Sequence, residues 1–206
     1  NNSQKETEDI SGIYSFRGQN ALLKTFLGEC SDGNIIHLST HAEGGNGNKA
    51  PSIEFSDTTL YLPELYALNL SADLVVLSAC ETNLGKIEKG EGVMSLARGF
   101  TYAGAISLIS SLWKVNESST ADISSKLYKY LVEGKTKSEA LHQSKLDYIN
   151  QASELKNSPY YWAGFVFIGN DGTVELSTGL GWKTWLLIGG LSLVVLFFIW
   201  RKRRFS

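Results

Sequence analysis

The segment LVVLSACETNLG, residues 74–85, decides the fold class of this chain. Its first part, LVVLS at 74–78, is an apolar run of the kind found in strands covered on both faces of a parallel sheet. Cys80 follows that strand directly and is itself followed by loop-forming residues. Because functional groups in open α/β sheets gather just beyond the carboxyl ends of strands, Cys80 is the first candidate for chemistry.

The segment HLSTHAEGG, residues 37–45, repeats this arrangement. A short buried strand is predicted over 35–39, and His41 lies just past its end. If the two strands are neighbours, the imidazole of His41 and the thiol of Cys80 face each other across one crevice. An imidazole there takes the proton of a thiol whose ordinary pKa is about 8.5, and so produces the nucleophilic thiolate. The candidate oxyanion donors are the backbone N–H groups of Cys80, Ala42 and Gly44, the last two in a loop that continues through Gly45.

The rest of the body alternates strands with helices. Asn20 is predicted to cap the first helix, and Thr136 with Glu139 forms a capping box for the last. Ser56 to Thr58 separate two short apolar runs, which predicts a hairpin. The predicted strands beyond the first two cover 53–55, 59–61, 105–113 and 165–168, and the predicted helices cover 21–27, 63–68, 93–100, 123–131 and a stretch from 137 onward. This order predicts an α/β sandwich of three layers, with helices on both faces of a mainly parallel sheet.

Composition excludes several classes of protein. With 206 residues, 43% of them hydrophobic, 19% charged and a net charge of −2, the chain suits one globular domain with a short appendage. Apolar clusters recur too often for a disordered protein, and no basic excess favours a nucleic-acid partner. Two cysteines are too few for a disulfide framework, and they form no C-x-x-C pair.

Other residues of interest have ordinary interpretations. His37 precedes His41 by four, but on a strand this spacing makes no zinc site without acidic or thiol companions, so no metal is expected. His142 is interpreted as a solvated helix residue, and Cys30 as part of a turn at a helix end. The glycines at 85, 90 and 92 match neither a phosphate loop nor G-x-G-x-x-G, which makes nucleotide binding a weak alternative.

Residues 184–200 contain no charged side chain. At 1.5 Å per residue they span roughly 25 Å as a helix, near the short limit for a bilayer core of about 30 Å. Trp182, Trp185 and Trp200 stand at the two ends, where amphipathic rings favour the lipid interface. A membrane helix over 183–200 is therefore predicted; a buried core helix is the alternative.

Charge is unevenly distributed around this segment. Residues 183–206 carry five basic and no acidic side chains. Since the whole chain has a net charge of −2, residues 1–182 have a net charge of −7. Since basic flanks stay in the cytoplasm, a single-pass protein with its body outside and its tail inside is expected. That orientation requires an export signal upstream, and because residue 1 is Asn, the chain is interpreted as a fragment of a longer protein.

Several segments, taken in order, resemble the CHAT family of caspase-like cysteine peptidases. The resemblance runs from about Gly18 to Gly169 and is carried by HLSTHAEGG (37–45), LVVLSACETNLG (74–85), GEGVMSLARGFTYAGA (90–105), SLWKVN (111–116) and YYWAGFVFIGN (160–170). It implies a caspase-like α/β sandwich, a catalytic dyad of His41 and Cys80, and no cofactor. It also implies that Trp113 lines the substrate pocket, although an aromatic residue on a strand is also consistent with core packing.

The chain departs from the family pattern in two respects. Ala42 stands where the family commonly has glycine after the catalytic histidine, but alanine still supplies an N–H if its backbone angles allow. The family usually has another half-domain of sheet before Gly18, and often tetratricopeptide repeats further upstream; the chain contains neither.

These observations predict a membrane-anchored cysteine endopeptidase that acts on proteins or peptides. The alternative is a caspase-like scaffold without activity that presents a binding surface at the membrane. The expected organisation is a polar segment over 1–17, a CHAT peptidase domain lacking its N-terminal part over 18–170, a linker over 171–182, a membrane helix over 183–200 and a basic tail over 201–206.

Overall fold

A five-stranded sheet forms the centre of the molecule in the computed structural model. The structure describes residues 13–31, 34–45, 49–78, 86–88 and 92–174. The strand order is β1-β2-β6-β9-β10, in which the first four strands are parallel and β10 is antiparallel to β9. These strands are β1 (Ile13–Arg17), β2 (Ile35–Ser39), β6 (Leu74–Leu77), β9 (Ser107–Ser111) and β10 (Phe165–Gly169). The prediction of a mainly parallel sheet is confirmed.

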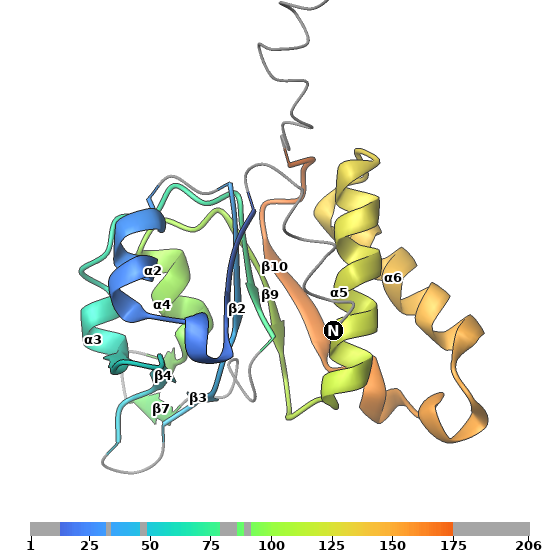
Figure 1. The fold of residues 1–206 in the computed structure, drawn as a ribbon, viewed down its shortest axis with the longest axis horizontal. Helices are drawn as coiled ribbons and strands as arrows, with labels where there is room; N and C mark the ends of the chain where they lie inside the picture. Colours follow the sequence, from blue (N-terminus) through green and yellow to red (C-terminus); the bar gives the residue numbers. More distant parts are fainter. Residues whose placement is uncertain (1–12, 32–33, 46–48, 79–85, 89–91, 175–206) are drawn as a thin grey trace, which may run out of the picture. The chain divides into compact units, whose positions relative to one another are not determined.

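Helices cover both faces of this sheet, so the molecule has three layers (Figure 1). One face carries α2 (Leu23–Glu29), α3 (Leu62–Leu65) and α4 (Leu96–Tyr102), and the other carries α5 (Glu117–Val132) and α6 (Lys137–Gln151). Three short 3-10 helices, η1 (Gly18–Asn20), η2 (Glu154–Lys156) and η3 (Pro159–Tyr161), complete the helical elements of the described residues.

A second sheet, of order β3-β4-β5, lies beside the first. Its strands are β3 (Ala42–Glu43), β4 (Ser52–Glu54) and β5 (Thr59–Tyr61). β4 and β5 pair antiparallel around the turn at 55–58, which confirms the predicted hairpin. A further hairpin joins β7 (Lys86–Glu88) to β8 (Gly92–Met94).

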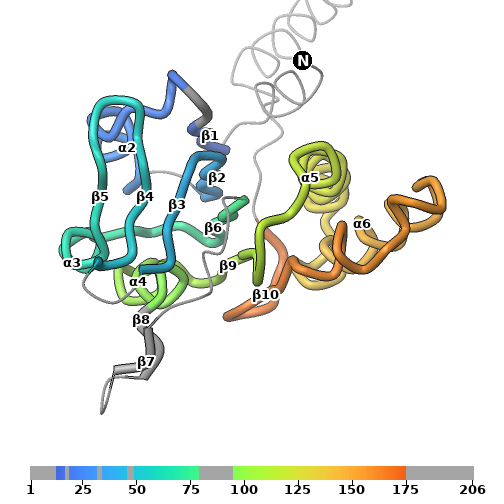
Figure 2. The backbone as a smooth tube through the Cα atoms, turned by 90° about the horizontal axis from the view of Figure 1, so that it is seen from below, coloured from blue at the N-terminus to red at the C-terminus, as the bar shows by residue number. Residues whose placement is uncertain are grey.

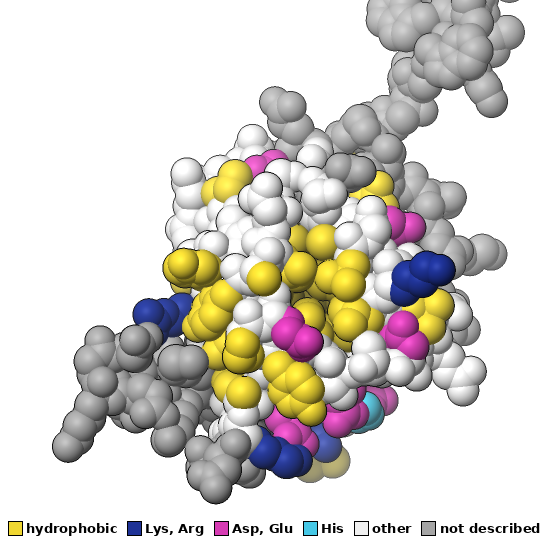
Figure 3. Space-filling view, turned by 90° about the vertical axis from the view of Figure 1, so that its left-hand side faces the viewer, with side chains coloured by type: hydrophobic (Ala, Val, Ile, Leu, Met, Phe, Trp, Pro, Cys, Tyr) yellow, Lys and Arg dark blue, Asp and Glu magenta, His cyan; other side chains and the backbone are white. Residues whose placement is uncertain are grey.

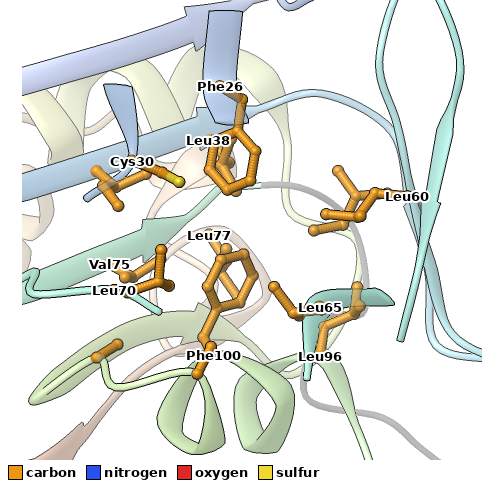
Figure 4. Packing of buried hydrophobic residues seen from close by; sticks show 14 of the residues in the cluster. Phe26, Cys30, Leu38, Leu60, Leu65, Leu70, Val75, Leu77, Leu96 and Phe100 are labelled. Carbon is orange, nitrogen blue, oxygen red and sulfur yellow. The ribbon is translucent and has the colours of Figure 1, made fainter. Parts of the chain in front are cut away.

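Alternation along the central strands divides the core in two. Leu38 and Leu77 pack toward α2, α3 and α4 (Figure 4), whereas Val76 packs toward α5 and α6. Fully burying an aliphatic or aromatic side chain of this size contributes about 1.5–3 kcal/mol. Both faces of the central strands are therefore buried, as the apolar runs in the sequence predicted.

The first long helix begins differently from the prediction. Asn20 lies in η1 and caps nothing in α2, which starts at Leu23. Instead, the Leu23 N–H donates to Asp57 Oδ1 at 2.7 Å, from the β4–β5 turn. This hydrogen bond holds the pKa of the Asp57 carboxyl below its ordinary value. The cap comes from 34 residues away in the chain, which is why local sequence did not reveal it.

Two other helix starts show the strength and the limit of local signals. The capping box of Thr136 and Glu139 at the start of α6 is confirmed. The predicted helix over 93–100 starts later, at Leu96, because the Ser95 hydroxyl accepts the Arg98 N–H and caps it there. Val93, counted in the helical pattern, belongs to β8.

The two ends of the chain bear on the predicted organisation. β1 occupies residues 13–17, at the end of the segment that the sequence suggested was merely polar, and it pairs with β2 as an edge strand. In the part of the chain that the structure describes, every helix is too short or too polar to cross a membrane. The predicted membrane helix at 183–200 lies outside those residues.

Two glycines end α4 and α5 in the same way, which allows a matched test. In each case the glycine follows the C-cap with positive φ, +111° at Gly104 and +81° at Gly134. A Cβ on Gly104 would stand 2.4 Å from the carbonyl oxygen of Leu70, whereas one on Gly134 would have no atom within 4 Å.

We expect Gly104→Ala to lower the free energy of unfolding by about 3 kcal/mol, from backbone strain and the clash together. Gly134→Ala adds strain alone and should cost about 1 kcal/mol. Urea unfolding followed by far-UV circular dichroism measures both. Equal losses would show that the Leu70 backbone moves away at little cost.

Candidate active site

The carboxyl ends of β2, β6 and β9 meet at one edge of the central sheet, the lower edge in Figure 1. Figure 2 looks at this edge, with the sheet strands in a row and β3, β4 and β5 on one side. β2 and β6 are parallel neighbours, and their register pairs Leu38 with Leu77. His41 follows Leu38 by three residues, as Cys80 follows Leu77. The expectation that the two strands are neighbours is confirmed, while Cys80 itself lies outside the described residues.

His41 is fixed through its backbone and exposed through its side chain. The Glu54 N–H donates to the His41 carbonyl at 2.8 Å, and the Thr40 hydroxyl donates to the Glu54 carbonyl. These bonds attach the segment after β2 to β4. His41 is exposed, so its side chain is open to solvent.

Ala42 presents its N–H away from β4. In an antiparallel pair, directly opposed residues alternate between hydrogen-bonded and non-bonded positions. His41 and Glu54 occupy a bonded position, so the next pair, Ala42 and Ile53, occupies a non-bonded one. Since β3 is an edge strand, this N–H is directed away from its own sheet, while the Ala42 side chain is buried beside Ile53.

The glycines after β3 differ in conformation. Gly44 is half-buried, and it is not among the glycines with positive φ. Gly45 has φ of +81°, and a Cβ there would stand 2.9 Å from the Lys49 carbonyl oxygen. Gly45 is thus the position where the turn itself requires glycine.

Trp113 follows β9 at the same sheet edge and is half-buried. Its Nε1–H donates to the Tyr160 carbonyl at 2.9 Å, and the Tyr160 hydroxyl donates to the Lys114 carbonyl at 2.9 Å. A Cβ on Gly164 would approach the indole to 2.9 Å, so the ring lies close against the backbone of this turn. The indole is held in place with part of its surface accessible.

His37 is the residue whose surroundings sequence reasoning missed. It lies on β2, is only 2% exposed, and contacts Tyr128 of α5 and Ser78 at the end of β6. Sequence spacing compared it only with His41, as a possible metal ligand. A hydrogen bond to a residue 91 positions away has no sequence signal.

The remaining candidates lie as expected. His142 is exposed on α6, and Cys30 is buried at the end of α2, before β2 begins. Among the described residues, no three His, Cys, Asp or Glu side chains are grouped so that they could hold a metal ion.

Comparisons with known proteins agree with this geometry. The model of the CHAT domain family matches residues 4–170. Tetratricopeptide repeat protein 28 is similar in sequence, at 32% identity over 52% of this chain for the Mus musculus protein and 29% over 63% for the Homo sapiens protein. The chain spans only 4% and 5% of those two relatives.

Two solved structures share the fold. The separase–securin complex of Saccharomyces cerevisiae matches 74% of this chain and 9% of its own, with a TM-score of 0.55 and 15% identity. The complex of the pro- and mature domains of RgpB from Porphyromonas gingivalis matches 78% of this chain and 38% of its own, with a TM-score of 0.54 and 12% identity. Because the family model covers residues 4–170 of the 206, the chain belongs to the CHAT domain family.

Proposed function

We propose that this domain is a cysteine endopeptidase whose nucleophile is Cys80 and whose base is His41. The observation that carries the proposal is the parallel pairing of β2 with β6, in which both residues follow the last register pair by three positions. Equal offsets at one edge favour an imidazole and a thiol within reach of each other. Membership of the CHAT family supports the same assignment.

The proposed reaction needs no metal or organic cofactor. The Cys80 thiolate attacks the carbonyl carbon of a peptide bond, and the thiol proton passes to His41. The backbone N–H groups of Cys80, Ala42 and Gly44 stabilise the resulting oxyanion. The C–N bond then breaks as His41 returns the proton to the leaving amine, and water hydrolyses the thioester. Trp113, with its accessible indole surface, is proposed to line the substrate pocket.

We also propose that residues 183–200 anchor the domain in a membrane, with the body outside and the basic tail in the cytoplasm. The uncharged run with tryptophans at both ends and basic residues after it supports this arrangement. For the whole protein, we propose that tetratricopeptide repeats lie upstream of this domain.

A second candidate is an interaction scaffold without activity. The face formed by α2, α3 and α4 gathers hydrophobic side chains (Figure 3). The large exposed hydrophobic side chains in these helices or directly before them are Leu22, Leu27, Tyr61 and Tyr102, of which Tyr102 is 74% exposed. A surface of this kind favours protein partners. It is compatible with either function.

An electrophilic peptide probe, followed by mapping of the adduct by mass spectrometry, separates the two candidates. We expect labelling of Cys80 but not of the buried Cys30, loss of labelling in His41→Ala, and no loss in His142→Ala, a matched exposed histidine. A membrane-impermeant form of the probe, applied to intact cells, should label Cys80 as well. Equal labelling of Cys80 in the parent and in His41→Ala would exclude the dyad. If the permeant probe labels Cys80 and the impermeant probe does not, the orientation in the membrane is the reverse of the one proposed.

A further inference from the structure

His37 is a polar residue in a row of the sheet that is apolar on β6 and β9, while its neighbour on the edge strand β1 is Ser15. Its register neighbour on β6 is Val76, and that of Val76 on β9 is Ile109. All three side chains belong to the face that packs against α5 and α6. Burying an imidazole among them costs free energy unless its ring nitrogens are hydrogen-bonded. The partners of the two ring nitrogens therefore decide what this residue can do.

Two hydroxyl groups bond to the ring nitrogens of His37. The Ser78 Oγ lies 3.0 Å from His37 Nε2, and it is also 3.2 Å from the Leu38 carbonyl oxygen, to which it can donate. The Tyr128 hydroxyl bonds to His37 Nδ1. Both ring nitrogens therefore have a hydrogen-bond partner.

This chain of hydrogen bonds ends where β6 leaves the sheet. The last residue of β6 in the register is Leu77, which pairs with Leu38 on one side and Ser110 on the other. Ser78 is held beyond that point by its own N–H, which donates to the Leu38 carbonyl at 3.1 Å, and by its hydroxyl. Cys80 is two residues further along the chain.

We propose that His37 is a positioning residue for Cys80. This inference rests on the proposed function. The His37 imidazole holds the Ser78 hydroxyl, and through it the strand end that precedes Cys80 in the sequence. Tyr128 connects the same imidazole to α5, so the helix layer determines where the strand end lies. A misplacement of about 1 Å in a reacting group lowers a rate about 100-fold, which makes such a support effective.

Two substitutions separate positioning from packing. Glutamine at position 37 keeps a side-chain amide that can bond to the Ser78 hydroxyl as donor or acceptor, whereas leucine keeps a similar volume and removes that hydrogen bond. In His37→Leu we expect the rate of covalent labelling of Cys80 by the peptide probe to fall about 10- to 100-fold, with probe affinity unchanged. In His37→Gln the rate should return to within about threefold of the parent. His142→Leu, on exposed α6, should match the parent.

A second measurement is independent of peptidase activity. Loss of one hydrogen bond at the strand end should speed amide hydrogen exchange of Ser78 about tenfold in His37→Leu, and much less in His37→Gln. If His37→Leu does not fold, Ser78→Ala provides a second test. It removes the hydroxyl that bonds to His37, leaves the histidine in place, and should lower the labelling rate by a similar factor.

The outcomes are distinct. A parent chain that shows no His41-dependent labelling removes the proposed function, while the exchange of Ser78 still decides whether His37 holds the strand end. A parent that is labelled, with equal rates in His37→Leu and the parent, overturns the positioning role. Equal losses in the leucine and glutamine variants overturn it too, because they would reflect packing and not the hydrogen bond to Ser78.

Discussion

Replacing His41 by alanine should lower kcat/KM for peptide hydrolysis by about 10³- to 10⁵-fold. Much of this loss is the contribution of general acid–base catalysis by a positioned side chain. Because His41 and Cys80 are proposed to act as one unit, removal of either one removes the contribution of both. The fold should be unaffected, because the segment is held through the His41 carbonyl and the Thr40 hydroxyl, while the His41 side chain is exposed. The expected loss is therefore catalytic.

A fluorogenic peptide library, varied at the residue before the cleaved bond, identifies the peptide that the parent chain cleaves fastest. That peptide is then used with His41→Ala, His142→Ala and the double variant His41→Ala/Cys80→Ala. The double variant should be no slower than the worse single variant, since the two groups share one step. Retention of more than a tenth of the parent activity in His41→Ala would assign the base to another residue.

Much of the fold could be predicted from the sequence, because a run of apolar residues indicates a segment that is buried. The run at 74–78 predicted a strand buried on both faces, and β6 has that environment. The pattern around Ser56 to Thr58 predicted a hairpin for the local reason that two short apolar runs flank a polar turn. The positions of His41 and Cys80 just past two strands were enough to propose a shared site.

What the sequence did not reveal depends on contacts between distant segments. The direction of β10, antiparallel to β9, is set by how the chain returns after α6, and its apolar run fits either direction. The Asp57 cap on α2 joins residues 34 apart, and the His37–Tyr128 bond joins residues 91 apart. Such pairs follow from packing of the layers, which periodicity does not encode.

Replacing Phe26 by alanine is the stability change with the largest expected effect. Phe26 is fully buried on α2, with its ring centroid 5.5 Å from that of Phe16 on β1 and 5.3 Å from that of Phe55 after β4. Its ring therefore lies between an edge strand of the central sheet and the segment that follows β4 of the small sheet. Truncation of a buried phenylalanine lowers the free energy of unfolding by about 3–5 kcal/mol, from lost burial and the cavity left behind.

Leu27, the next residue on α2, provides the matched control because its side chain is 45% exposed. Leu27→Ala should change the free energy of unfolding by about 0.5 kcal/mol or less, since alanine suits a helix and little burial is lost. Urea unfolding in a non-ionic detergent measures both variants. Similar losses at the two positions would mean that α2 contributes through its helix alone. A large loss only at Phe26 means that the aromatic cluster of Phe16, Phe26 and Phe55 holds α2, β1 and the segment after β4 together.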